Sequence, residues 1–191
     1  ILDVHMERPE LLEALRVAEH EKNLRILDYY LELDPEYLFM GASGTLTMAS
    51  PSLFRTYGLP TLKEITRRAT EKKVPTLLHS CGRAWELVEM CAGETDLSCF
   101  NPLELPPMGD CRLAPAKRAF GDRLALMGNL HTTDTMLSGS REDVIEASRR
   151  AIEDAGAGGG FILSTGDQCG RDTPDENLFA VVEAVERYGW Y

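Results

Sequence analysis

Apolar residues recur along this chain in two alternating patterns. The first is a short, mostly apolar run, which is typical of a strand buried on both faces. The second places apolar residues every three or four positions, which predicts a helix. The expected strands lie near residues 37–40, 76–80, 97–101, 124–128 and 161–164. The expected helices lie within residues 9–33, 50–73, 82–93, 110–121, 140–156 and 173–189.

Cap residues support several of these helix boundaries. Pro9 suits the first turn of the first helix, because proline lacks an N–H that would have no partner there. Ser140 is expected to be an N-cap, and so is Thr173, with Pro174 at the first helical position. The helix within residues 50–73 is expected to be interrupted near Gly58.

The strict alternation of strand and helix predicts an α/β fold. Apolar strands that are each followed by a helix form a parallel sheet with right-handed crossovers. No linker or low-complexity tract divides the chain, so residues 1–191 are expected to form one domain.

Composition and charge narrow the functional classes. The net charge is −11 and no basic cluster is present, which argues against a nucleic-acid partner. The apolar stretches are too short to span a bilayer, so no membrane association is expected. Five irregularly spaced cysteines do not suggest a disulfide framework and fit a reducing, cytoplasmic location.

Polar and reactive residues gather where the expected strands end. In parallel βα proteins this end of the sheet carries the chemistry, so the pattern predicts an enzyme site. The candidates at these ends are Ser43, His79, Cys81, Glu104, Asn129, His131, Asp167 and Cys169.

His79 and Cys81 are the strongest metal-ligand candidates. Residues two apart in a strand point the same way, and zinc accepts imidazole, thiolate and carboxylate ligands. Glu104 follows the next strand and Cys169 follows the last, so both are candidate further ligands. The alternatives are buried packing for the two cysteines and a solvated loop carboxylate for Glu104.

The segments that carry these residues resemble the C-terminal part of the uroporphyrinogen decarboxylase superfamily. The matching stretches are "ASPSLFRTYGLPTLKEI", "LLHSCGR", "MGDCRLAPAKRAFGDRLALMGNL", "GGGFILSTG" and "TPDENLFAVVEAVERYG". The resemblance implies a (β/α)8 barrel of the TIM type. Members are much longer than this chain, so a partial barrel of about five strands is expected.

The His-x-Cys form is similar to that of the zinc-dependent, corrinoid methyltransferases of this superfamily. The resemblance implies that His79, Cys81 and a later cysteine hold zinc, which activates a thiol to accept a methyl group from methylcobalamin, on a partner corrinoid protein. Asp167 stands where that cysteine is expected and Cys169 comes two residues later. The third ligand is therefore Cys169 if the loop is slightly shifted, and otherwise it is Asp167 or the site has no third protein ligand. A similar order of ligands in cobalamin-independent methionine synthase supports Glu104.

The remaining candidates have less specific roles. His131 could shuttle a proton or orient substrate, or it could be a capping or loop histidine. Asp167 is a second catalytic candidate. Substrate binding is assigned to Ser43, Asn129 and Arg171, and the alternative for Arg171 is an ion pair with a neighbouring acid.

Two other functions stay open beside the methyltransferase. One is a decarboxylase of the uroporphyrinogen type, although the histidine-glycine pair of that enzyme is replaced here by "GDQCG" at residues 166–170. The other is an inactive partial barrel that serves as a binding scaffold. Because five strands do not close a barrel, a homodimer is expected. The alternatives are strands from an N-terminal segment outside this sequence, or the helix within residues 9–33 folded across the gap.

Overall fold

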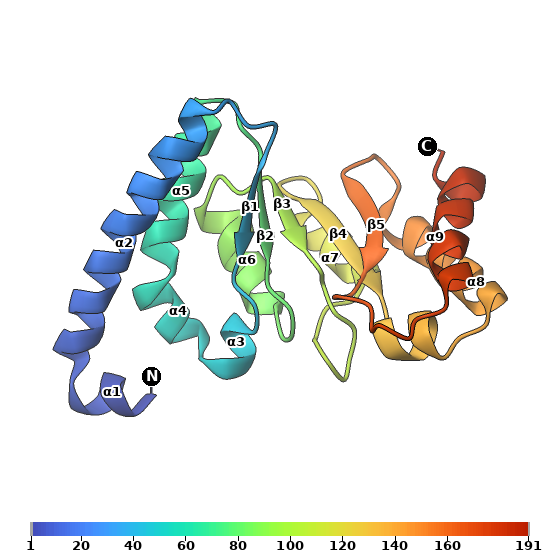
Figure 1. Cartoon of the computed structure of the whole chain (residues 1–191), viewed down its shortest axis with the longest axis horizontal. Helices are drawn as coiled ribbons and strands as arrows, with labels where there is room; N and C mark the ends of the chain where they lie inside the picture. Colours follow the sequence, from blue (N-terminus) through green and yellow to red (C-terminus); the bar gives the residue numbers. More distant parts are fainter. Residues whose placement is uncertain (1, 191) are drawn as a thin grey trace.

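A parallel sheet forms the centre of the molecule. The computed structural model describes residues 2–190, and within them five parallel strands lie side by side in sequence order (Figure 1). They are β1 (Leu38–Gly41), β2 (Thr76–His79), β3 (Cys99–Asn101), β4 (Ala125–Leu130) and β5 (Phe161–Thr165). Each lies within two residues of an expected run, which confirms the parallel α/β fold and the partial barrel.

Helices connect the strands as the apolar spacing predicts. The expected helices are α2 (Pro9–Glu32), α4 (Pro51–Tyr57), α5 (Leu59–Glu71), α6 (Trp85–Glu94), α7 (Leu113–Phe120), α8 (Arg141–Ala155) and α9 (Asp175–Tyr188). Three short elements are additional: α1 (Leu2–Glu7), α3 (Thr45–Met48) and the π-helical η1 (Thr132–Leu137). No helix within residues 2–190 combines the length and the apolar character needed to cross a membrane.

The helix caps show where local sequence determines local structure. The Ser140 side chain accepts the N–H of Asp143, whose carboxylate accepts the N–H of Ser140, so α8 begins with a capping box. The expectation that Thr173 caps α9 is wrong. Pro174 is extended, with ψ 133°, and itself occupies the N-cap position, so the helix begins one residue later.

One face of the sheet is covered by the helices. The strand register aligns Leu78, Phe100, Leu126 and Phe161 in one buried row, and this row packs against apolar residues of α5 to α9. Figure 1 shows the helices wrapping round the sheet, from α2 and α5 at one end to α8 and α9 at the other. The hydrophobic core therefore lies between the sheet and this helical layer.

The other face of the sheet is open. Residues that alternate with the buried row point to it, and Phe39 and Ile162 are 61% and 48% exposed. Their register partners, Leu77 for Phe39 and Met127 for Ile162, are half-buried. His79 alternates with the buried Leu78, so it lies on this open face, at the carboxyl end of β2.

Candidate functional site

Three candidate residues come together at the carboxyl end of the sheet. His79 is the last residue of β2, Cys81 follows two residues later, and Asp167 comes two residues after the end of β5. One ligand atom from each of these side chains lies within 4.8 Å of those of the other two. The fold thus joins residues almost ninety positions apart in the chain into one cluster.

The His79 ring is held in one orientation. Its Nδ1 lies 2.7 Å from Oδ1 of Asn101, the register partner of His79 on β3. The ring also lies against Phe39, with 6.1 Å between the ring centroids. Nε2 therefore faces the cluster, where it lies 3.8 Å from Oδ1 of Asp167.

The spacing of the cluster suits a shared metal ion better than direct hydrogen bonding. A separation of 3.8 Å between His79 Nε2 and Asp167 Oδ1 is too long for a hydrogen bond. Two ligands of one tetrahedral zinc, with bonds of about 2.0–2.1 Å, lie about 3.4 Å apart. The donors are one nitrogen, one sulfur and one oxygen, all of which zinc accepts. These three residues therefore fit a zinc ion.

Glu104 lies beside this cluster with its carboxylate engaged. The side chain is buried, and its Oε2 accepts the N–H of Gly82, the residue after Cys81. Gly109 closes over it, since a Cβ at this glycine would lie 2.7 Å from Glu104 Cβ. Glu104 does not belong to the three-residue cluster found within residues 2–190. Its assignment as a zinc ligand stays a prediction.

The two candidates for the later ligand lie in different surroundings. Asp167 belongs to the cluster, whereas Cys169 is half-buried and packs against the hydrophobic core. The loop that follows β5 therefore turns the carboxylate, and not the thiol, towards His79 in this conformation.

Three other cysteines are core residues. Burial raises the pKa of Cys91 to about 12 and that of Cys99 to about 11. The pKa of Cys111 is raised to about 12, chiefly by burial and then by the nearby Asp110 carboxylate. A thiol with such a pKa stays protonated near neutral pH. These residues fit the packing interpretation of a buried cysteine.

His131 caps a helix. It is the N-cap of η1, and its Nδ1 accepts the N–H groups of Thr133 and Asp134 at 3.3 and 3.0 Å. Because Nδ1 accepts, the ring proton belongs on Nε2, which is buried and has no hydrogen-bond partner within the described chain. His131 therefore has a capping role in the structure. It lies outside the cluster, so its catalytic role stays a prediction.

The three candidates for substrate binding lie in different surroundings. Ser43 lines a hollow of about 450 Å³ together with His79 and Asp167. Asn129 is buried, and its Nδ2 donates to the Leu103 carbonyl at 2.8 Å, which is a structural bond. Arg171 is exposed and pairs with Asp172 at 3.0 Å, the alternative weighed for it from the sequence. Of the three, Ser43 thus lines the hollow beside the cluster, and Asn129 and Arg171 do not.

Asn101 was noted at a strand end from the sequence, but no role was predicted for it. This residue lines the same hollow as His79 and is only 8% exposed. A signal was available, because Asn101 begins the "NPLE" segment at the end of the third expected strand. Only the register of β2 on β3 shows that it faces His79.

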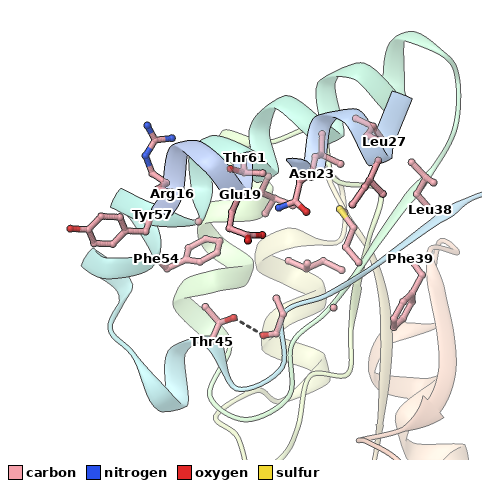
Figure 2. A pocket seen from close by; sticks show the side chains of 18 of the residues that line it. Arg16, Glu19, Asn23, Leu27, Leu38, Phe39, Thr45, Phe54, Tyr57 and Thr61 are labelled. Atoms are coloured by element: carbon pink, nitrogen blue, oxygen red, sulfur yellow. Dashed lines mark hydrogen bonds between the residues drawn. The ribbon is translucent and has the colours of Figure 1, made fainter. Parts of the chain in front are cut away.

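A second hollow lies on the helical side of the sheet, between α2, α5 and β1 (Figure 2). It has a volume of about 520 Å³ and is largely apolar, with Leu27 and Leu38 at one end. Arg16 and Glu19 lie on α2 at its rim. None of the three cluster residues lines it.

Comparison with known proteins identifies relatives of two kinds. The family model of uroporphyrinogen decarboxylase (URO-D) matches residues 3–188. A uroporphyrinogen decarboxylase of Coxiella burnetii is 31% identical over 160 residues, which cover 81% of this chain and 41% of that protein. A methylcobamide:CoM methyltransferase of Methanosarcina acetivorans is 29% identical over 135 residues, which cover 71% of this chain and 37% of that protein.

A solved structure shares the fold. It is described as a methyltransferase from Methanosarcina mazei, and it matches with a TM-score of 0.79 and 20% identity. The match covers 99% of this chain and 53% of that chain. The chain thus spans about half of this structure and about two fifths of the curated relatives.

Proposed function

The chain belongs to the uroporphyrinogen decarboxylase family, and from this premise we propose that it works as a zinc-dependent methyltransferase that moves a methyl group from a corrinoid to a thiol. The cluster of His79, Cys81 and Asp167 is the observation that carries the proposal. Decarboxylation offers no reason to assemble a nitrogen, a sulfur and an oxygen ligand at one point. The methyltransferases among the relatives support the methyltransferase proposal.

His79, Cys81 and Asp167 would hold the zinc, with a further position left for the substrate thiol. When bound, zinc lowers the pKa of a coordinated thiol and makes it nucleophilic near neutral pH. The protein fixes the directions of its own ligands through Asn101 at His79 and through Glu104 at the Gly82 backbone. These contacts orient the cluster before any substrate arrives.

The open hollow beside the cluster would receive the thiol. Phe39 and Met127 give it an apolar wall, and Ser43, Ser164 and Gln168 give it polar groups. When bound, a corrinoid would supply the methyl group: the substrate thiol would release its proton to solvent, its sulfur would bond to the methyl carbon, and the electron pair of the broken bond would remain with the corrinoid. We propose that a partner protein carries the corrinoid, because the relatives include a methylcobamide:CoM methyltransferase.

A decarboxylase of the uroporphyrinogen type is the second candidate. It is favoured by the Coxiella burnetii relative, which has a higher identity than the methyltransferase of Methanosarcina acetivorans. The two proposals differ in their need for metal. Methyl transfer to a zinc-bound thiol requires the cluster, whereas decarboxylation would proceed after chelation.

Zinc binding tests the proposal directly. We expect the purified protein, loaded with zinc and dialysed, to retain about one ion per chain by elemental analysis. His79→Ala should lower zinc affinity at least ~100-fold, because it removes one of three protein ligands. His20→Ala is the matched control, since His20 lies on α2 and bonds to Thr61.

Activity separates the two functions. Methylation of a small thiol from methylcobalamin should be lost in His79→Ala and kept in His20→Ala. Equal zinc affinity in wild type and His79→Ala would reject the metal site. Zinc-independent release of carbon dioxide from uroporphyrinogen would support the decarboxylase instead.

A further inference from the structure

Asn101 is placed to determine which nitrogen of the neutral His79 ring carries the proton. It ends β3 as the direct register partner of His79, and its side chain lies in the same hollow. Oδ1 of Asn101 is 2.7 Å from Nδ1 of His79. The residue is 8% exposed, so water competes little for this hydrogen bond.

The orientation of the Asn101 amide follows from its second contact. Nδ2 lies 3.4 Å from the main-chain carbonyl of Met127 on β4, a group that only accepts hydrogen bonds. The NH2 group must therefore face Met127, and Oδ1 must face His79. Because Oδ1 only accepts, Nδ1 of His79 has to carry the ring proton.

We propose that Asn101 is a positioning residue that fixes His79 in its Nδ1–H tautomer and so keeps the lone pair of Nε2 directed at Cys81 and Asp167. A neutral imidazole binds metal through its unprotonated nitrogen, and its other nitrogen is usually held by a hydrogen-bond acceptor. The tautomer assignment stands on hydrogen bonding alone. Its consequence for metal binding rests on the proposed zinc site.

The opposite tautomer conflicts with the surroundings. A proton on Nε2 would leave Nδ1 as an acceptor, so Asn101 would have to turn its NH2 group towards His79. Oδ1 would then face the Met127 carbonyl, and two acceptors would meet in a buried place. The β2–β3–β4 register therefore selects one tautomer before metal binds.

Nitrogen NMR of the metal-free protein tests the tautomer. With ¹⁵N-labelled histidine at a pH where the ring is neutral, we expect the His79 signals of the Nδ1–H form. Asn101→Leu removes the acceptor and should shift His79 to the Nε2–H form or to a mixture. Asn101→Asp keeps an acceptor towards His79 and should restore the Nδ1–H form, although it loses the donor to the Met127 carbonyl and should lower stability. Unchanged His131 signals would show that the variants are folded, because His131 is fixed by its own cap.

Zinc affinity tests the consequence. Asn101→Leu should weaken zinc binding by about 10–100-fold, and Asn101→Asp should stay within a few-fold of wild type. If His79 keeps the Nδ1–H form in Asn101→Leu, the inference is overturned even where zinc binds normally. If wild type binds no zinc although the tautomer shifts as expected, the metal proposal fails and the role of Asn101 stands.

Discussion

At the scale of single residues, the surroundings of each cysteine predict its reactivity. Cys81 and Cys169 are half-buried, whereas Cys91, Cys99 and Cys111 are buried with raised pKa values. At pH 8 we therefore expect iodoacetamide to modify Cys81 and Cys169 and to leave the other three thiols intact. Peptide mass spectrometry of the folded protein measures this.

Zinc turns the same labelling experiment into a test of ligand choice. Added zinc should protect Cys81, which belongs to the cluster, and leave Cys169 reactive. If zinc protects Cys169 as strongly as Cys81, then Cys169 is the later zinc ligand, which is one of the alternatives left open by the sequence. His79→Ala should abolish the protection of Cys81.

Gly109 supports the site through its lack of a side chain. A Cβ here would lie 2.4 Å from the Glu104 carbonyl oxygen and 2.7 Å from that of Gly82. Both neighbours are backbone atoms, so Gly109→Ala should lower the free energy of unfolding by about 1–3 kcal/mol. Zinc affinity should fall too, because Gly82 adjoins Cys81.

Urea unfolding measures the effect of Gly109→Ala, and Gly93→Ala is its control. A Cβ at Gly93 would meet nothing within 4 Å, and this residue lies inside α6. Alanine there should be neutral or stabilising, because glycine is the poorer helix former. Equal stability of the two variants would contradict the packing described around Glu104.

The sequence predicted which residues form the site better than it predicted how these residues contact one another. His79, Cys81 and Asp167 were visible because they stand at strand ends. The bond from Asn101 to His79 was not, because strand register depends on how whole strands pack. The bond that Glu104 accepts from Gly82 is likewise a tertiary contact between two loops.

At the scale of elements, long periodic segments were predictable and short ones were not. All five strands and the long helices followed from apolar spacing. By contrast, α3 has four residues and η1 has six, too few to show a period. Thr173 shows a further limit, because a serine or threonine before proline marks a helix start without giving its first residue.

The capping box of α8 makes a quantitative prediction at this scale. Ser140→Ala removes the oxygen that accepts the Asp143 N–H, so it should lower the free energy of unfolding by about 1 kcal/mol. Ser138→Ala is the control, since Ser138 is exposed and precedes the cap. Urea denaturation followed by circular dichroism compares them. Equal midpoints for the two variants would show that the box adds nothing to stability.

At the scale of the whole molecule, the buried thiols should make stability depend on alkaline pH. Their folded-state pKa values of about 11 to 12 lie above the usual value of 9.0 because burial disfavours the thiolate. The stabilisation of the folded state by these protonated thiols is therefore complete below pH 9, and it is lost as the pH rises from 9 towards 12. Each buried thiol should make the free energy of unfolding roughly 1 kcal/mol lower at pH 10 than at pH 8.

Urea titrations at pH 8 and pH 10 measure this loss. Cys91→Ala should reduce the pH dependence, even though it lowers stability at both pH values by creating a cavity. Cys169→Ala serves as the control, because Cys169 is only half-buried. An unchanged slope in Cys91→Ala would contradict a role for this thiol in alkaline unfolding.

The open sides of the sheet lead to the last prediction, that the chain forms a homodimer. Within residues 2–190, β1 and β5 each pair on one side only, so each presents unpaired backbone groups at an edge. Phe39 and Ile162 are exposed on the open face, and α2 and α9 carry further exposed apolar residues. Burying each such side chain is worth about 1.5–3 kcal/mol, and a second copy offers apolar surface of the same kind.

Light scattering across a range of concentrations decides the matter. We expect a mass near twice 21.2 kDa. Phe39→Asp should shift the protein towards monomer, because it places a charge on the open face. Met48→Asp is the control, since Met48 is 83% exposed but lies on α3, outside the sheet. A stable monomer at every concentration, with the sheet protected from hydrogen exchange, would mean that the open face is stable in water without a second copy.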